Sequence, residues 1–263
     1  MFFLIFILSL IIGYIMILIL LQDLHFPNLE LKKFQVKDSE SKTNVLFIFP
    51  HPDDEVMSSG GLLRKLVKDK NFNVFVVDVT KGDRGDEILK LSPEELGKVR
   101  ESEFKIVMKI VGVKNGEVWD IPDGKVPENF EKLKRQVEEF IQKNNINLVV
   151  TYEKWGVYGH QDHVALSKVV HEISESNKDV KVLYSTIGPK VARSLNLKKY
   201  IKGLDLANFE SNEPPEFKLF TLKEAFARFL AARQYKSQNL SHKYPLWVTI
   251  LMNPYEYYTT KYE

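Results

Sequence analysis

The sequence predicts an α/β fold in which a mostly parallel sheet carries helices on both faces. Short apolar runs alternate along the chain with longer segments whose apolar residues recur at helical spacing. Dense polar clusters follow two of the apolar runs, as is typical of open α/β sheets that bind ligands beyond their strand ends. The chain beyond its first 43 residues leaves about 220 residues, which is enough for one such domain with a full core.

The expected strands are apolar runs bounded by polar or turn-forming residues. They cover residues 45–49, 74–79, 146–152 and 180–185. The expected helices cover residues 60–68, 93–111, 127–144, 162–174 and 221–238. The helix over 93–111 has the clearest start, because Ser92 is a good N-cap, Pro93 takes the first helical position and Glu95 can complete a capping box.

The N-terminal segment is almost unbroken in its apolar character over residues 2–21. At ~1.5 Å rise per residue, such a helix reaches across a bilayer core of ~30 Å. We therefore expect a transmembrane anchor over residues 1–22, followed by a linker over 23–43. A cleaved signal peptide is the alternative, but no Lys or Arg precedes the run and no Ala-x-Ala follows it.

The lysines that follow this segment predict its orientation. Lys32, Lys33 and Lys37 lie just after the apolar run. Because Lys and Arg near a span favour the cytoplasmic side, we expect a single-pass membrane protein whose main domain is cytoplasmic.

Composition excludes several classes of site. The net charge of +2 gives no reason to expect nucleic acid as a partner. The absence of cysteine excludes disulfides and thiolate ligands, so a metal would have to use His, Asp or Glu. The glycines at 82–85 are too closely spaced for a phosphate-binding loop.

Two polar clusters carry the chemistry. His51-Pro52-Asp53-Asp54-Glu55 directly follows the expected strand 45–49, and Tyr158-Gly159-His160-Gln161-Asp162-His163 follows the strand 146–152. Because ligands bind at the carboxyl ends of parallel strands, the two clusters are expected to converge in one crevice.

A metal site follows from the residue types in these clusters. Catalytic zinc usually has three protein ligands and one open position, and His51, Asp54 and His163 can supply the three. Asp53 is then free to take a proton from a metal-bound water, whose pKa zinc can lower from ~15.7 to about 7. His160 could meet an oxyanion or protonate a leaving amine.

Two further acids in the clusters are expected to act other than as metal ligands. Asp162 could orient one of the imidazoles of its own loop. Glu55 fits a helix N-terminal charge better than a ligand. Either cluster alone also fits an ordinary turn, and it is their shared position after strand ends that favours a metal site.

These motifs resemble those of the PIG-L/LmbE-type zinc-dependent de-N-acetylases. That family has His-Pro-Asp-Asp-Glu after its first strand and Gly-His-x-Asp-His after a later one, and both occur here without substitution at 51–55 and 159–163. Weaker agreement is found at 80–83, at Arg100 and Glu103, at 111–113 and at 235–238. The resemblance covers residues 44 to about 240, so a deacetylase domain is expected over 44–263.

The resemblance implies a Rossmann-like fold and hydrolysis of an acetamide on a glucosamine-type sugar, with Zn²⁺ as cofactor. By matching position, it makes His51, Asp54 and His163 the zinc ligands. It makes Asp53 the general base and gives His160 the role of oxyanion stabiliser or acid.

The same resemblance suggests further site residues. Asp162 would hold the orientation of His160, and Tyr158 would reach the transition state. Arg84 and Asp123 fall in loops where bacterial relatives bind the sugar.

The substrate is expected to be an N-acetylglucosaminyl lipid or glycoside, similar to N-acetylglucosaminyl-phosphatidylinositol, since a membrane anchor suits a lipid-linked substrate. Residues 80–85 look closer to prokaryotic members of the family, so a free chitooligosaccharide or a thiol-precursor sugar is the near alternative.

Two other classes remain as hypotheses. A Mg²⁺-dependent phosphoesterase could use Asp53, Asp54 and Glu55, but the histidines of the same clusters do not suit Mg²⁺. The second hypothesis is a membrane-tethered protein that binds a sugar without catalysis. The presence of Asp53 and His160 argues against it, because neither residue is needed merely to hold a sugar.

Overall fold

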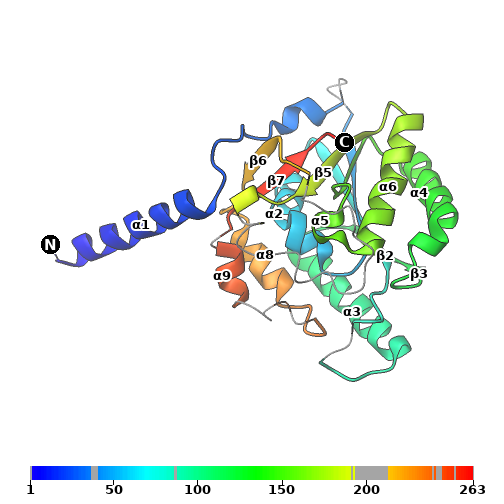
Figure 1. Ribbon diagram of the computed structural model, residues 1–263, viewed down its shortest axis with the longest axis horizontal. Coiled ribbons are helices and arrows are strands. Elements are labelled where there is room, and N and C mark those ends of the chain that lie inside the picture. The colour runs from blue at the N-terminus through cyan, green and yellow to red at the C-terminus, as the bar shows by residue number, and fades with distance from the viewer. Residues whose placement is uncertain are drawn as a thin grey trace.

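A seven-stranded sheet forms the centre of the protein (Figure 1). The computed structural model describes residues 2–36, 41–85, 88–190, 192, 213–238, 240, 245–251 and 253–262. The strands are β1 Thr43–Phe49, β2 Phe72–Thr80, β3 Asn115–Ile121, β4 Leu148–Tyr152, β5 Lys181–Thr186, β6 Phe217–Phe220 and β7 Tyr255–Thr259.

The strand order is β3-β2-β1-β4-β5-β7-β6. Strands β1 to β5 are parallel, whereas β7 runs antiparallel to β5 and β6 runs antiparallel to β7. The predicted mostly parallel α/β sheet is therefore confirmed.

The helices divide between the two faces of the sheet. Their bounds are α1 Phe2–Leu21, α2 Asp54–Lys68, α3 Pro93–Val111, α4 Phe130–Asn144, α5 Gly156–Gly159, α6 Gln161–Ser176, α8 Ala225–Ala232 and α9 Leu246–Leu251, with short 3-10 helices at Leu31–Phe34 and Pro127–Asn129. Helices α2, α3 and α8 pack together, and α4 packs on α6 (Figure 1).

Each face of the sheet has its own hydrophobic core. Phe47 of β1 joins the core that includes Leu62 of α2, whereas its neighbour Ile48 joins the core that includes Leu166 of α6. Successive residues of a strand point to opposite faces, so a strand covered on both sides must be apolar throughout. This is why β1 was recognisable in the sequence as a continuous apolar run.

The predicted elements differ from the observed ones mainly at the edges of the sheet. All four predicted strands are present, but β3, β6 and β7 were not predicted. Residues 115–117 of β3 are exposed, so this edge strand lacks an apolar run. Helix α3 has the predicted bounds and the predicted capping box, whereas α2 begins at Asp54 and α8 is much shorter than the predicted 221–238.

The N-terminal helix α1 forms as expected and extends away from the body of the domain (Figure 1). Within the described residues, however, no helix combines the length and the hydropathy needed to cross a lipid bilayer. The transmembrane anchor predicted over 1–22, and the single-pass location derived from it, are therefore not supported.

The segment after α1 packs against the domain. The Lys190 ammonium donates hydrogen bonds to the carbonyl oxygens of Ile19 (3.0 Å) and Gln22 (2.9 Å). Leu29 and Phe34, which belong to the expected linker, are buried in the core. Residues 37–40 of that linker lie outside the described part of the chain.

The order of the strands places the functional loops. Strand β1 lies between β2 and β4, so the loops that follow β1 and β4 leave the same edge of the sheet where the strand order reverses. Such a switch point is where open α/β sheets bind ligands. Thr80 ties the strand ends together, because its backbone N–H (3.0 Å) and hydroxyl (2.9 Å) both donate to the Pro50 carbonyl oxygen.

Candidate metal centre and active site

The structure brings the two predicted clusters together. The ring centroid of His51 lies 5.0 Å from that of His160 and 5.3 Å from that of His163, and the last two are 4.9 Å apart. One ring nitrogen from each of the three lies within 4.8 Å of the others, so the group could hold a metal ion.

Asp54 lies between two of these histidines. Its Oδ2 atom is 3.2 Å from His51 Nδ1 and 3.4 Å from His163 Nε2. For bonds of about 2.0–2.1 Å to a tetrahedral zinc, neighbouring ligand atoms are about 3.3 Å apart. The spacing of Asp54 from both histidines therefore fits a shared metal ion.

The second ring nitrogen of His51 faces two further carboxylates. His51 Nε2 is 3.1 Å from Asp123 Oδ1 and 3.2 Å from Asp162 Oδ2, and these three groups could also hold a cation. Both candidate groups use His51. The carboxylates on Nε2 can accept its proton, which leaves Nδ1 free on the side of Asp54.

His163 is held in one orientation by the turn before it. Its Nδ1 atom lies 3.2 Å from the Gly156 carbonyl oxygen, which can only accept a hydrogen bond. The proton therefore sits on Nδ1 and Nε2 is left to bind. Gly156 has a φ of 59°, and a Cβ there would stand 2.2 Å from His163 Cβ. Only glycine fits this close approach.

His160 forms the N-cap of α6. Its Nδ1 accepts a hydrogen bond from the backbone N–H of Asp162 (3.2 Å), so the neutral ring carries its proton on Nε2. The Asp162 carboxylate instead accepts from the backbone N–H groups of Gly124 (2.7 Å) and Val126 (3.2 Å) and faces His51. The Asp162 side chain thus orients the ring of His51 and not, as expected, that of His160.

Asp53 stands at the start of α2 with a φ of 115°. Arg100 lies beside it, with Nη2 3.5 Å from Asp53 Oδ2. The same guanidinium donates to the carbonyl oxygens of Pro52 (2.6 Å) and Gly82. A Cβ at Gly82 would stand 2.0 Å from Arg100 Nη1, so the glycine of the 80–83 motif makes room for this guanidinium.

The C-terminal motif at 235–238 makes hydrogen bonds to buried acids of α2 and α3 next to the site. The Ser237 backbone N–H (3.0 Å) and hydroxyl (2.6 Å) donate to the Glu103 carboxylate. The Tyr235 hydroxyl donates to Glu55, which is fully buried. Glu55 lies in the first turn of α2, as expected of a helix N-terminal charge, but it is buried there rather than exposed to solvent.

The pKa shifts within the proposed ligand set favour a bound cation. Burial lowers the pKa of His51, but its hydrogen bonds to Asp123, Asp162 and Asp54 outweigh burial and raise the pKa well above its usual value. Burial raises the pKa of Asp54, but the neighbouring His163 and His51 lower it overall. Both shifts show that the surroundings of these groups favour a positive charge, which a bound metal would supply.

The other titratable groups are tuned mainly by burial. Burial raises the pKa of Asp53 well above its usual value, against the opposing charge of Arg100. Burial lowers the pKa of His163 to about 3 and, together with the charge on His51, lowers that of His160. Neutral histidines suit metal binding, and a carboxylate with a raised pKa suits a general base near neutral pH.

The remaining predicted residues lie around the same site. The Tyr158 hydroxyl is 3.5 Å from His163 Nε2. The Asp123 carboxylate accepts a hydrogen bond from the backbone N–H of Arg84 (2.8 Å), whose side chain is exposed. Arg84 and Asp123, predicted from distant loops, are thus brought together next to His51.

Two buried residues of the site were missed from the sequence. Tyr152 is the last residue of β4, and its hydroxyl donates to Asp54 (2.8 Å). Asp78 is fully buried in β2, and neither of its carboxylate oxygens has a hydrogen-bond partner. An acid within an apolar strand was the available signal for Asp78, whereas Tyr152 looked like an ordinary strand residue.

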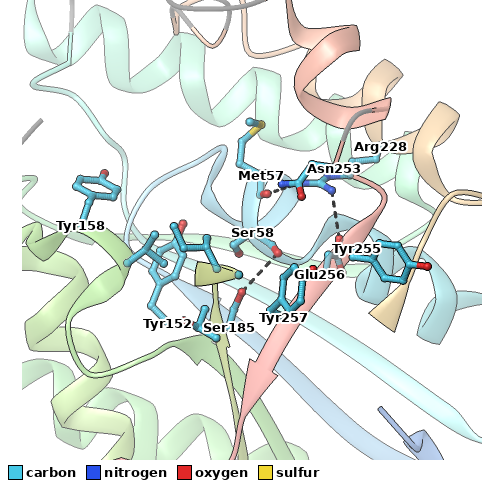
Figure 2. Close-up of a pocket in the computed structure, with 14 residues that line it drawn as sticks. Met57, Ser58, Tyr152, Tyr158, Ser185, Arg228, Asn253, Tyr255, Glu256 and Tyr257 are labelled. Carbon is cyan, nitrogen blue, oxygen red and sulfur yellow. Dashed lines mark hydrogen bonds and ion pairs between the residues drawn. The ribbon is translucent and has the colours of Figure 1, made fainter. Parts of the chain in front are cut away.

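A pocket of about 270 Å³ adjoins the metal centre (Figure 2). Tyr152 and Tyr158, whose hydroxyls contact Asp54 and His163, border it on one side, and Tyr255 and Tyr257 lie at its other side. Glu256, 3.5 Å from the Arg228 guanidinium, balances the positive charge in its wall.

The comparisons with known proteins agree with the site. Residues 46–174 match the PIG-L family, described as GlcNAc-PI de-N-acetylase. A probable N-acetylglucosaminyl-phosphatidylinositol de-N-acetylase from Schizosaccharomyces pombe is 25% identical over 169 residues, which cover 62% of this chain and 62% of the relative. A 1D-myo-inositol 2-acetamido-2-deoxy-alpha-D-glucopyranoside deacetylase from Corynebacterium diphtheriae is 28% identical over 166 residues, which cover 54% of this chain and 56% of the relative.

The fold is shared with solved structures. The N,N'-diacetylchitobiose deacetylase from Pyrococcus horikoshii superimposes with a TM-score of 0.59 at 22% identity, covering 84% of this chain and 80% of the other. The chain spans less than two thirds of the length of the two sequence relatives described above. The loops after β1 and β4 both lie inside residues 46–174, the part of this chain that matches the PIG-L family.

Proposed function

We propose that the protein is a metal-dependent hydrolase that removes the acetyl group from an N-acetylglucosamine moiety, with Zn²⁺ as its metal. The observation that carries this proposal is the position of Asp54, whose Oδ2 atom lies 3.2 Å from His51 and 3.4 Å from His163. Asp53 and His160 stand beside this set, where a base and an acid are needed. The match of residues 46–174 to the PIG-L family supports the same reaction.

In this proposal His51 Nδ1, Asp54 Oδ2 and His163 Nε2 hold the metal. When bound, such a metal makes water more acidic and polarises the amide carbonyl. Asp53, with its raised pKa, takes the proton of the attacking water. His160 directs its Nε2 proton to the developing oxyanion, or delivers a proton to the leaving amine.

The sugar is proposed to bind on the side of Asp123 and Arg84. Asp123 can accept hydrogen bonds from sugar hydroxyls, and the exposed Arg84 side chain can donate them. Tyr158, close to His163, is proposed to reach the transition state with its hydroxyl. Asp162 supports the reaction through His51, which its carboxylate faces.

The substrate is proposed to be an N-acetylglucosaminyl lipid or glycoside similar to N-acetylglucosaminyl-phosphatidylinositol. Relatives named for that lipid and for a glucosaminyl inositol support this choice. A free chitooligosaccharide is the second candidate, favoured by the likeness to a diacetylchitobiose deacetylase.

An acetate-release assay tests the proposal. Purified protein, loaded with Zn²⁺, is incubated with N-acetylglucosaminyl-phosphatidylinositol, N-acetylglucosaminyl-inositol and diacetylchitobiose, and acetate is measured. We expect release from at least one conjugate, and none from the His163→Ala variant. Absence of acetate from the whole panel would sink the deacetylase proposal.

Metal analysis of the same preparation distinguishes the proposed deacetylase from a Mg²⁺-dependent phosphoesterase. Zinc or a similar transition ion at about one equivalent agrees with a set of two histidines and one carboxylate. Stoichiometric Mg²⁺ together with phosphate release from a phosphoester panel would favour a phosphoesterase instead.

A further inference from the structure

Tyr152 touches two of the three proposed metal ligands. Its side chain is 5% exposed, and its hydroxyl donates a 2.8 Å hydrogen bond to Asp54 Oδ1. Its ring lies parallel to that of His163, with centroids 4.5 Å apart and planes 6° apart. One residue outside the two sequence motifs therefore contacts a ligand from each motif.

Because of this hydrogen bond, the two oxygens of the Asp54 carboxylate have different partners. Oδ1 is bound by the Tyr152 hydroxyl, while Oδ2 faces His51 and His163. A carboxylate that is free at both oxygens can turn and bind a metal with both of them. With Oδ1 engaged, only Oδ2 is presented to the metal, which leaves a coordination position open for water and substrate.

The Tyr152 ring is itself fixed by neighbouring elements. Phe49, at the end of β1, packs edge-on against it with centroids 5.0 Å apart. The Ser167 hydroxyl of α6 donates to the Tyr152 carbonyl oxygen (2.8 Å). The packing of strand and helix around Tyr152 therefore holds its hydroxyl against Asp54.

We propose that Tyr152 is a positioning residue that holds Asp54 in one-oxygen coordination and keeps the His163 ring in its binding orientation. The inference rests on the proposed metal set His51, Asp54 and His163. The alternative is that the Asp54 carboxylate only provides an acceptor for the buried Tyr152 hydroxyl, with no effect on the metal. The alternative predicts a loss of stability without a change in metal geometry.

Tyr152→Phe removes only the hydroxyl and keeps the stacked ring. We expect zinc affinity, measured against a chromophoric chelator, to fall about 10- to 100-fold, as is usual when a partner of a ligand is lost. In the cobalt-loaded protein we expect weaker visible absorption bands, because two-oxygen binding by Asp54 raises the coordination number.

Tyr184→Phe is the matched control. Tyr184 is a buried tyrosine of the neighbouring strand β5, and its ring packs with Tyr262 on the other face of the sheet. This variant should keep wild-type zinc affinity and the wild-type cobalt spectrum. Tyr152→4-fluorophenylalanine, which nearly fills the space of the hydroxyl without a donor, serves if Tyr152→Phe does not fold.

The outcomes are distinguishable. Wild-type affinity and an unchanged cobalt spectrum in a folded position-152 variant would overturn the positioning role. If the wild-type protein itself binds neither zinc nor cobalt, the proposed metal set fails and this inference falls with it. Acetate release does not enter the measurement, so an error in the substrate leaves the test intact.

Discussion

Asp53 combines a strained backbone with a buried carboxyl group. Its φ of 115° is rare for any residue but glycine, and such strain persists only where the surroundings hold it. The Asp53 backbone N–H donates to Glu55 (3.0 Å), and its carbonyl oxygen accepts from the N–H of Met57 (2.9 Å). These bonds fix the carboxylate beside the metal centre without making it a ligand.

Asp53→Asn should separate binding from turnover. Asparagine tolerates positive φ better than most residues, so the backbone is expected to stay in place. Metal content by mass spectrometry should match wild type, while acetate release falls on the order of 10²- to 10⁴-fold, since the amide cannot act as a base. Substantial remaining activity would exclude Asp53 as the general base.

Gly156→Ala should damage the metal centre through packing alone. The new methyl group would collide with His163, at a φ that disfavours alanine. We expect the free energy of unfolding to fall by about 1–3 kcal/mol and zinc affinity to drop. Gly13→Ala is the control, because a Cβ at Gly13 meets nothing within 4 Å. Equal behaviour of the two variants in denaturant titration would contradict this account.

At the scale of residues, the sequence predicted which side chains meet but not every partner. His51, Asp54, His160 and His163 converge because each follows a strand end at one edge of the sheet. The partner of Asp162 could not be foreseen, since it depends on how the loop around Gly124 folds against α6.

Among the elements, the turn between β4 and α6 depends on one buried acid. The Glu153 carboxylate accepts from the backbone N–H groups of Trp155 (2.8 Å), Val157 (2.6 Å) and Glu213 (3.3 Å). Val157 adopts a φ of 70°, which is costly for a β-branched residue. These bonds hold the short helix α5, which carries Gly156 and Tyr158 to the metal centre.

Glu153 should make stability fall as the pH rises. Burial raises its pKa from 4.5 to about 7. Between these values the unfolded chain loses the proton while the folded protein keeps it, so this group lowers the free energy of unfolding progressively between pH 4.5 and 7. The full loss, reached above pH 7, is roughly 3 kcal/mol.

Glu153→Gln is the test of this dependence. The amide cannot ionise, so the difference in unfolding free energy between the variant and wild type should shift in favour of the variant from pH 5 to pH 8. Lost hydrogen bonds add an offset that is the same at every pH. A difference that stays flat across this range would show that Glu153 keeps an ordinary pKa.

The elements that were predicted correctly are those buried on both faces. Strands β1, β2, β4 and β5 appear in the sequence as apolar runs because helices cover both their faces. The edge strands β3 and β6, and β7 next to β6, carry exposed or polar side chains. Their pairing depends on contacts with residues far away in the chain, and the local sequence pattern does not indicate these contacts.

At the scale of the whole molecule, α1 contributes little to the core. Many of its large apolar side chains are exposed, and hydrogen bonds from Lys190 attach its C-terminal end to the domain. The segment that follows is different in kind, because Leu29 and Phe34 are buried. Along the described chain, burial in the core therefore begins only after the end of α1.

Deletion of residues 2–21 should leave a folded protein. We expect the midpoint of thermal unfolding to change by less than about 4 °C, which corresponds to about 1 kcal/mol in a domain of this size. Phe34→Ala, as the contrasting variant, should cost about 3–5 kcal/mol because it empties a core position. A deleted protein that unfolds or aggregates like Phe34→Ala would show that α1 belongs to the core.

The overall topology of the sheet was predictable from the sequence. Whether the N-terminal helix spans a membrane was not. Alternation of strands and helices implies parallel pairing, and right-handed crossovers restrict the possible sheet orders. The apolar run at 2–21 indicated a helix, which is present, but the composition of a segment does not by itself determine what surrounds it.

The pairing of β1 with β4 has a consequence for biosynthesis. These neighbouring strands are separated in the chain by α2, β2, α3, β3 and α4, and the proposed metal ligands follow one strand and the other. A nascent chain on the ribosome carries His51 and Asp54 long before His163 has been made. With the proposed ligand set, a metal would bind with full affinity only after His163 has left the exit tunnel, so that metal loading would follow the completion of most of the sheet.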